Sequence, residues 1–285
     1  MTTHALQPDT GDPWRLLPFS DEPMGRQLAL SEGMLAALDQ TGAPALRWYI
    51  PRESALVLGN GQPPSVADAE ALAARDVALY KRPSGGTAVL VDTTLLSLDL
   101  ALPHSHPLAT SDVVRAYEWV GALWADALRT LGASDVRALP TAEVRAIPAL
   151  PREDPLRLAC YGTLSPWEVV TGEAPRKLVG LCQIRRHHGA LYQIGVYLRH
   201  DATALADLLA LPSDTRATLA GQLALAAAGL DEATGGARWD ARAVIAAFER
   251  TLAERHNVAL IPAAWLPAEL EYALHLEAER FQRLV

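Results

Sequence analysis

Residues 81–89 read Lys-Arg-Pro-Ser-Gly-Gly-Thr-Ala-Val, and this stretch is the most informative part of the sequence. It follows a strand-like run at 77–82 and leads into a second apolar run that begins at Thr87. The adjacent Gly85 and Gly86 permit a positive φ and remove side-chain bulk, so a ligand can approach the backbone closely. Free N–H groups in such a loop can point at a carbonyl or phosphate oxygen. The alternative is an ordinary tight turn, and a Walker loop is excluded because no Gly-Lys-Ser/Thr follows at the required distance.

The apolar periodicity on either side of this loop predicts an α+β fold. Strand-like runs dominate up to about residue 198 and helical patterns follow, an order that is typical of helices packed on a mixed, mainly antiparallel sheet. The stretch 139–155 contains four prolines, which exclude one regular element and predict a long loop. Ser111 is expected to cap the helix that follows it. The predicted elements are strands at 14–19, 45–50, 55–58 and 77–82, hairpins of 87–92 with 95–102 and of 178–184 with 191–198, and helices at 24–38, 66–75, 111–131, 243–255 and 269–280.

Composition and charge limit the classes of protein to which the chain can belong. It has 285 residues, of which 50% are hydrophobic and 20% charged, as in ordinary globular proteins. We expect a flexible tail at 1–13 and one domain at 14–285, whose part from about 200 onward is helical. The net charge of −8 argues against a nucleic-acid partner, which would require a basic face. The chain lacks a long apolar run and a signal-peptide pattern, so we expect no membrane span, a cytoplasmic location and reduced thiols.

Two further positions carry reactive side chains that could act on a ligand bound at the glycine loop. Lys177 opens an otherwise apolar strand that ends at Gly180, and an ammonium drawn into a cleft can stabilise an oxyanion or a phosphate. Cys160 follows the proline-rich stretch, and a cysteine close to a cation can ionise and accept an acyl group. The alternatives are a solvated lysine and a buried, inert cysteine, since no Cys-His pair is evident. No histidine has zinc-ligand spacing, so no metal site is predicted.

Several segments together resemble the lipoate–protein ligase and octanoyltransferase family, which is related to biotin ligases. The loop at 81–89 resembles the family's Arg-Arg-x-Ser-Gly-Gly-Gly-Ala-Val, and residues 177–185 resemble its Lys-x-x-Gly-Ser-Ala-Gln-x-Arg. Residues 47–49 and 58–62 resemble its Arg-Trp-Tyr and Leu-Gly-x-x-Gln segments. Residues 160–168 are similar to the Cys-Phe…Pro-Ser-x-x-Glu stretch of a branch that uses a cysteine. The resemblance spans nearly the whole chain and implies the fold of the biotin and lipoate ligase catalytic domain.

The resemblance implies an acyltransferase that acts in protein lipoylation. In the cysteine-dependent branch, Cys160 would accept an octanoyl or lipoyl group as a thioester and pass it to a lysine of a lipoyl carrier protein. Octanoyl acyl carrier protein would be the donor, a lipoyl domain or a glycine-cleavage H-type protein would be the acceptor, and no cofactor would be required. By this resemblance the catalytic residues are Cys160 and Lys177, and the substrate-binding residues are Arg47, Arg82, Ser84, Gly85, Gly86, Thr87, Ala88, Gly180, Cys182, Gln183 and Gly195.

Two other functions remain open. An ATP-dependent lipoate–protein ligase would use ATP and Mg²⁺ to form an acyl-adenylate and would need neither cysteine. A catalytically silent acyl-binding relative is favoured by Val91 and Ile194, which replace two histidines of the family pattern. In addition, Thr87 replaces the third loop glycine. Leu181 and Cys182 stand where the family has Ser-Ala, which makes Cys182 a second candidate thiol.

Overall fold

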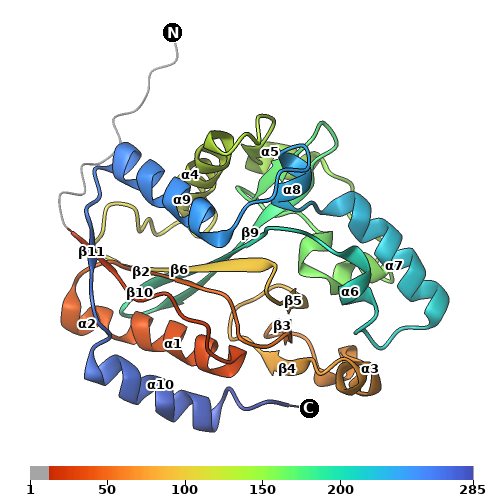
Figure 1. The fold of residues 1–285 in the computed structure, drawn as a ribbon, viewed down its shortest axis with the longest axis horizontal. Coiled ribbons are helices and arrows are strands. Elements are labelled where there is room, and N and C mark those ends of the chain that lie inside the picture. Colours follow the sequence, from red (N-terminus) through yellow and green to blue (C-terminus); the bar gives the residue numbers. More distant parts are fainter. Residues whose placement is uncertain (1–12, 285) are drawn as a thin grey trace.

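A computed structural model describes residues 13–284, and a large mixed sheet runs through its centre (Figure 1). The tail expected at 1–13 lies outside the described residues except for Pro13. In spatial order the strands are β11 (Leu260–Pro262), β1 (Trp14–Leu16), β2 (Ala45–Tyr49), β6 (Leu95–Pro103), β10 (Gly189–Tyr197), β9 (Arg176–Arg186), β8 (Val169–Thr171) and β7 (Arg137–Ala138). Strand β1 runs parallel to β11 and β2, and the other neighbouring pairs are antiparallel. The predicted mixed, mainly antiparallel sheet is therefore confirmed.

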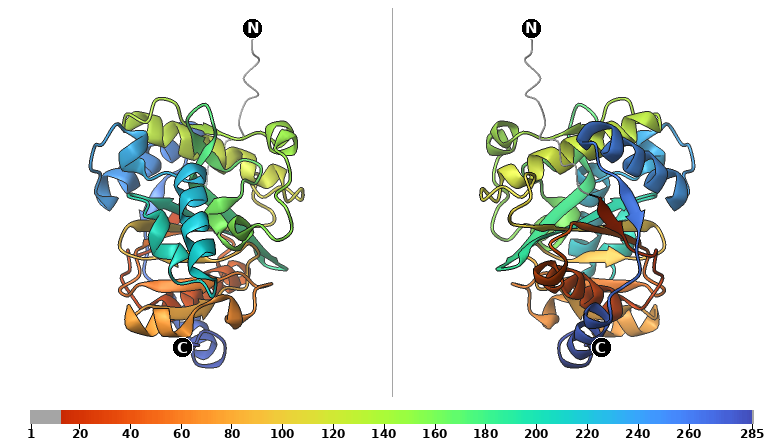
Figure 2. Two further views of the ribbon diagram at one scale, coloured as in Figure 1. Left: turned by 90° about the vertical axis from the view of Figure 1, so that its right-hand side faces the viewer. Right: turned by 90° about the vertical axis from the view of Figure 1, so that its left-hand side faces the viewer.

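Both faces of this sheet are covered, which explains why all nine residues of β6 are buried. Successive side chains of a strand point to opposite faces. Leu96, Leu98 and Leu100 belong to the core beneath α4 (Glu118–Thr130) and α9 (Ala241–His256), whereas Ser97 and Asp99 face the side of α1 (Met24–Ala36) and α10 (Pro267–Glu279). Figures 1 and 2 show these two helical layers on either side of the sheet.

A smaller sheet stands beside the large one and supports the glycine loop. Its central strand β3 (Ala55–Leu58) is parallel to β4 (Ala78–Lys81) and antiparallel to β5 (Val89–Val91). Leucines of β3 pack against helical residues that include Leu72 and Leu219. The helices that contribute to this second core are α3 (Ala69–Ala74), α6 (Ala202–Ala206) and α7 (Ser213–Ala226).

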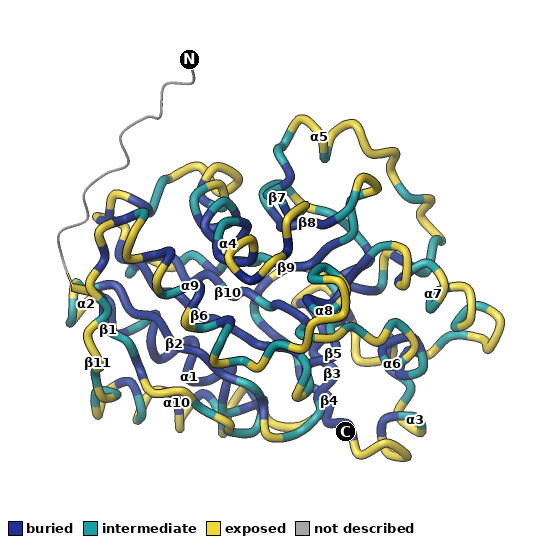
Figure 3. Tube along the Cα trace, turned by 45° about the horizontal axis from the view of Figure 1, so that its top comes forward, coloured by how far each residue is buried: buried dark blue, intermediate teal, exposed yellow. Residues whose placement is uncertain are grey.

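The remaining elements complete the outer layers. The short helices are α2 (Leu38–Thr41), α5 (Thr141–Ala146) and α8 (Leu230–Ala233). The part of the chain after residue 200 is helical as expected, except that β11 returns to the large sheet and pairs with β1. Burial is concentrated in the sheets and the inner sides of the helices, while loops and helix exteriors are exposed (Figure 3). No helix between residues 13 and 284 is long and apolar enough to cross a membrane.

Three local expectations are wrong, each for a structural reason. The stretch 139–155 is not a loop throughout, because α5 begins after Pro140 and ends before Pro148, so that no proline lies inside the helix. The runs at 87–92 and 95–102 do not form a hairpin, because β5 belongs to the small sheet and β6 to the large one. A turn at Asp92, whose carboxylate accepts hydrogen bonds from Thr94, separates the two strands. Helix α4 begins at Glu118 rather than near Ser111, after a turn capped by Asp112. The expected hairpin of β9 and β10 is confirmed.

Candidate active site

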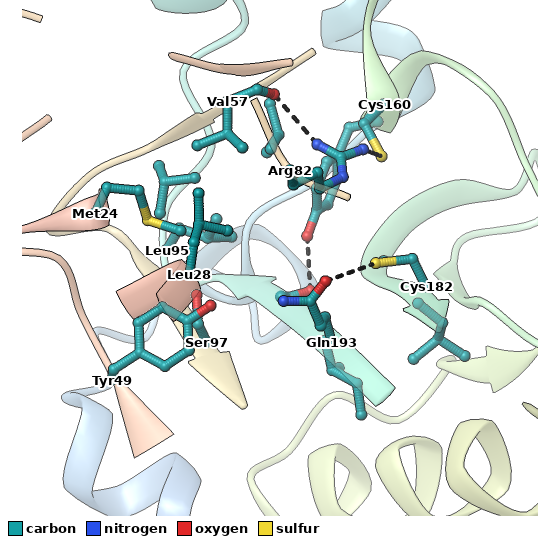
Figure 4. A pocket seen from close by; sticks show the side chains of 17 residues that line it. Met24, Leu28, Tyr49, Val57, Arg82, Leu95, Ser97, Cys160, Cys182 and Gln193 are labelled. Atoms are coloured by element: carbon teal, nitrogen blue, oxygen red, sulfur yellow. Dashed lines mark hydrogen bonds between the residues drawn. The ribbon is translucent and has the colours of Figure 1, made fainter. Parts of the chain in front are cut away.

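An apolar cavity lies where the two sheets meet the first turns of α1 (Figure 4). Its walls come from β2, β6, β9 and β10 of the large sheet, from β3 and β5 of the small sheet, and from α1. Figure 4 shows Met24 and Leu28 at one end, and Arg82 with the thiols of Cys160 and Cys182 at the other. This polarity suits a ligand with an apolar chain and a reactive or polar head.

The glycine loop borders the polar end of the cavity and is held in an unusual backbone conformation. Gly86 has a φ of +87°, which L-residues with a side chain rarely adopt. Gly59 allows the loop to pack closely, because a Cβ at that position would lie 1.9 Å from the carbonyl oxygen of Gly86. Within residues 13–284, the backbone N–H groups of Gly85, Gly86 and Thr87 donate no hydrogen bond. Gly85 and Gly86 are exposed, so this part of the loop offers three successive N–H groups that are not used by the protein within the described residues.

The segment that carries Cys160 is fastened to the end of this loop. The backbone N–H of Cys160 donates to the carbonyl of Ala88 at 2.8 Å, and the N–H of Ala88 donates to Leu158 at 3.0 Å. The side-chain amide of Gln62 donates to the same Leu158 carbonyl. Nη2 of Arg82 lies 4.0 Å from Sγ of Cys160, and a Cβ placed on Gly86 would lie 3.8 Å from that sulfur. The sequence-predicted loop and nucleophile are therefore neighbours.

Tyr161 anchors the nucleophile segment to the large sheet. Its hydroxyl donates to the carbonyl of Gly195 at 2.6 Å, and its ring covers Gly180 and Gly195. A Cβ on either glycine would approach the tyrosine within 3.2–3.4 Å, so small residues are needed here. Burial raises the pKa of Tyr161 well above its ordinary value, which keeps the hydroxyl neutral. The two glycines predicted to bind substrate thus also seat the residue after Cys160.

Lys177 lies behind the nucleophile segment rather than in the wall of the cavity. It is 1% exposed, and its ammonium donates to Glu168 Oε1 at 2.7 Å and to the backbone carbonyl of Cys160 at 2.8 Å. The other oxygen of Glu168 accepts the N–H of Ser165 at 2.6 Å. Burial raises the pKa of Glu168, and the ammonium of Lys177 opposes that rise. The lysine therefore joins β9 to the Cys160 backbone through a hydrogen bond, and its charge is compensated by the buried Glu168.

A row of polar side chains crosses the large sheet at one level and ends at the cavity. The strand registers align Arg47 with Asp99, Asp99 with Gln193, and Gln193 with Cys182. The guanidinium of Arg47 is 2.7 Å from the Asp99 carboxylate and also contacts Gln27 and Ser31. Burial raises the pKa of Asp99, an effect that Arg47 opposes. Arg47 is thus a buried structural partner and does not line the cavity.

Cys182 occupies a different environment from Cys160, although both thiols line the cavity. Its sulfur lies 3.5 Å from the hydroxyl of Ser84 and 4.0 Å from the amide oxygen of Gln193. The Ser84 hydroxyl itself donates to Gln193 at 3.1 Å. Burial raises the pKa of the Cys182 thiol, with Arg82 opposing the rise, so the thiol form is favoured.

Most of the sequence-predicted residues converge, but three lie elsewhere. Those that line the cavity are Arg82, Cys160, Gly180, Cys182 and Gly195. Those that lie in the adjoining loop without lining the cavity are Ser84, Gly85, Gly86, Thr87 and Ala88. Arg47 and Lys177 are buried beside the cavity, as described above. Gln183 follows Cys182 and points to the opposite face of β9, where its amide donates to the carbonyl of Val113 at 2.8 Å. The alternation of side chains along a strand places neighbouring residues on opposite faces.

The sequence analysis did not identify Gln193 or Tyr161 as residues of the site. It identified Ile194 as a departure from the family pattern but did not predict that this residue also belongs to the apolar core. The signal for Gln193 was its position two residues before Gly195, on the same face of its strand. Val91, which stands where the family has a histidine, lines the cavity and adds to its apolar surface. Ile194 borders the cavity, but it belongs to the core beneath α4.

One group of potential metal ligands lies away from the cavity, although the sequence predicted no metal site. The side chains of Asp39, His187 and His188 meet at the turn between β9 and β10, with their ligand atoms within 4.8 Å of one another. His188 pairs directly with Asp39, and the imidazole of His187 lies 3.6 Å from the same carboxylate. The contacts of both imidazoles with the Asp39 carboxylate account for this arrangement.

Comparisons with known proteins show what the chain is similar to. The profile of the lipoyl protein ligase A/B catalytic domain matches residues 23–253. An octanoyltransferase LipM from Kyrpidia tusciae is 30% identical over 203 residues, which cover 70% of this chain and 72% of that protein. An octanoyltransferase LipM from Moorella thermoacetica is 28% identical over 225 residues, covering 78% and 79%. A structure of the bipartite lipoate protein ligase and its E2 lipoyl domain from Thermoplasma acidophilum has a TM-score of 0.74 at 17% identity, over 95% of this chain and 93% of that chain.

Proposed function

This chain belongs to the lipoyl protein ligase A/B catalytic-domain family, and we propose that it transfers an octanoyl or lipoyl group to a lysine of a lipoyl carrier protein. The enzyme class follows from relatives that are named octanoyltransferases. The observation that carries the proposal is the position of Cys160. Its sulfur stands at the polar end of an apolar cavity, next to a loop with three available backbone donors.

In the first step, the thiolate of Cys160 attacks the carbonyl carbon of an octanoyl thioester. A sulfur–carbon bond forms, and the carbonyl electrons move to oxygen. We propose that the backbone N–H groups of Gly85, Gly86 and Thr87, which donate no hydrogen bond within residues 13–284, stabilise this oxyanion. Collapse of the intermediate expels the carrier thiolate, which takes a proton from water. The apolar end of the cavity, near Met24, holds the acyl chain.

In the second step, the neutral amine of the acceptor lysine attacks the acyl-enzyme thioester. The carbon–nitrogen bond forms, the nitrogen loses a proton to solvent, and Cys160 leaves as a thiolate. Exchange between two thioesters is nearly isoenergetic and amide formation from a thioester is downhill, so neither ATP nor another cofactor is needed. The donor in this scheme is octanoyl acyl carrier protein, and the acceptor is a lipoyl domain or an H-type protein of glycine cleavage.

Lys177 serves this scheme by holding the nucleophile in place. Its ammonium is hydrogen-bonded to the backbone carbonyl of Cys160 and to Glu168, and it lies outside the wall of the cavity. We therefore assign it as a positioning residue, in place of the catalytic role that the family resemblance implies.

The proposal is tested by incubating the chain with octanoyl acyl carrier protein and measuring intact mass. An octanoyl adduct should form, and peptide mapping should locate it on Cys160. The adduct should be absent from Cys160→Ser and retained by Cys182→Ser, which serves as the matched thiol control. Full transfer to a lipoyl domain by Cys160→Ser would refute the covalent scheme.

The same reaction separates the two alternatives. An ATP-dependent lipoate–protein ligase would release pyrophosphate from lipoate and ATP and would work without either thiol. A silent relative, which Val91 favours, would bind the octanoyl group and yield no modified lipoyl domain.

A further inference from the structure

Two buried cations flank the Cys160 segment, and they differ in how their charges are compensated. Lys177 is paired with Glu168 at 2.7 Å, and both side chains are almost completely buried. Arg82 is 7% exposed, yet no carboxylate in residues 13–284 lies within 4.0 Å of its guanidinium nitrogens. A buried charge without a counterion is strongly unfavourable, so Arg82 requires an explanation that Lys177 does not.

The contacts of Arg82 satisfy its N–H groups without neutralising its charge. Nη1 donates to the carbonyl of Val57 at 3.2 Å, and Nε donates to that of Gly85 at 3.2 Å. Nη2 donates to Gly85 at 3.0 Å and to Thr87 at 2.8 Å. These acceptors are neutral carbonyl oxygens. The remaining neighbour of Nη2 is Sγ of Cys160 at 4.0 Å, which becomes an anion when its proton is lost.

We propose that the thiolate of Cys160 is the counterion of Arg82, and that Arg82 is a catalytic residue which stabilises this thiolate. The inference rests on the proposed function, in which Cys160 is the nucleophile. The S–H proton passes to solvent, and the sulfur keeps the electron pair with which it attacks the thioester. Once the acyl-enzyme has formed, Arg82 again lacks a counterion. Departure of the Cys160 thiolate in the second step restores it, so the same pair promotes both steps.

The other groups around the two thiols support this assignment. Tyr161 and Tyr197 contact one another beside Cys160, and burial raises the pKa of each well above its ordinary value, so both are neutral. The charge of Glu168 is compensated by Lys177. Cys182 faces the neutral Ser84 and Gln193, and its thiol form is favoured. Arg82 therefore contacts the sulfur of Cys160 with a positive charge that no carboxylate within the described residues compensates.

The test measures ionisation of Cys160 without an acyl donor, so its result is separate from that of the transfer assay. In a Cys182→Ser background, the rate of iodoacetamide alkylation is followed by mass from pH 5 to 9.5. The proposal predicts that alkylation of the folded chain is half-maximal at least about one pH unit below that of the same chain in urea. Equal midpoints would overturn the proposal, whatever the variants do.

Variants then identify the cation responsible. Arg82→Gln should slow alkylation at pH 6.5 about tenfold, and Arg82→Lys should restore part of the rate. The comparison is the double variant Lys177→Gln, Glu168→Gln, which neutralises the other pair without leaving a buried charge but also removes the hydrogen bond to the Cys160 carbonyl. It should slow alkylation less than Arg82→Gln does, by about threefold at most. A loss in the double variant equal to that in Arg82→Gln would assign the effect to Lys177 and contradict the proposal. If Arg82→Gln does not fold, the comparison of folded and urea-treated chains, together with Arg82→Lys, still decides the question.

Discussion

The two faces of the large sheet bury different kinds of side chain. Beneath α4 and α9 the core is apolar, and Trp48, Trp124 and Phe248 meet with ring centroids 4.7–5.8 Å apart. Beneath α1 the same strands present Arg47 and Asp99, and the polar row leads from them to the cavity. One continuous sheet therefore separates an apolar core from a face that carries the reactive groups.

The difference shows how this fold combines stability with a defined site. Apolar burial is non-directional, so the core beneath α4 and α9 stabilises the sheet without selecting one arrangement. Each buried polar group on the other face needs a particular partner, which restricts the register of the strands. We expect substitutions on the face beneath α4 and α9 to change the free energy of unfolding. Substitutions on the face beneath α1 should change the rate of acyl transfer, the free energy of unfolding, or both.

The largest effect is expected where the polar face meets substrate. Cys160→Ser should lower acyl transfer by at least about a thousandfold, because the hydroxyl is a far weaker nucleophile than a thiolate. Its midpoint of thermal unfolding should stay close to that of the wild type, since serine is of similar size. Initial rates with octanoyl acyl carrier protein measure this. A variant that kept a tenth of the wild-type rate would remove Cys160 from the mechanism.

A substitution in the part of the polar row that does not line the cavity should destabilise the fold. Asp99→Ala leaves the buried guanidinium of Arg47 without its carboxylate and should lower the free energy of unfolding by about 3–5 kcal/mol. The double variant Asp99→Ala, Arg47→Met should be less destabilised than the single one, because no charge is left unpaired. Urea unfolding measures both. Equal stability of the wild type and Asp99→Ala would show that the pair does not support this face.

Phe248→Ala provides the matched change on the apolar face. Phe248 is fully buried between Trp48 and Trp124, so its truncation should lower the free energy of unfolding by about 3–5 kcal/mol. At a temperature where the variant is folded, its transfer rate should remain within about twofold of wild type. Urea unfolding and initial rates provide the two measurements. A selective loss of transfer would contradict the separation of the two faces.

The apolar face should also lose stability in acid, through His256 at the end of α9. Burial lowers the pKa of His256 to about 4 from its ordinary 6.5, so between these values the unfolded chain binds the proton more readily. Stability from this group is present above about pH 6.5 and is lost as the pH falls towards 4, by about 2–3 kcal/mol. Unfolding free energies measured from pH 4 to 7 should show this slope. His256→Gln should reduce it, and an unchanged slope in the variant would exclude His256 as its source.

The smallest effect is expected from the second thiol on the polar face. Cys182→Ser should lower the transfer rate by no more than about threefold, because burial favours the protonated thiol and, among the described residues, its sulfur is hydrogen-bonded only to Ser84 and Gln193. Rates measured together with those of Cys160→Ser give a direct ranking of the two cysteines. A loss as large as that of Cys160→Ser would reverse the assignment of nucleophile.

Local patterns in the sequence predicted the glycine loop, the hairpin of β9 and β10, and the α+β class. Each rests on residues that are close in sequence, such as the adjacent Gly85 and Gly86, whose conformational freedom is a property of the residues themselves. The position of Gln183 could have been predicted as well, because it must face away from Cys182 on the same strand.

Only the tertiary structure decided which of these groups meet. Arg82 and Cys160 are 78 positions apart, and Ser84 and Gln193 are 109 apart, so no local pattern indicates their contact. The sequence by itself determined that the chain has a glycine loop and a thiol suited to acyl transfer. The packing of two sheets determined that the thiol faces a guanidinium while Lys177 faces a carboxylate. The physical reason is that charge compensation in a buried site depends on three-dimensional distance, which the order of residues does not contain.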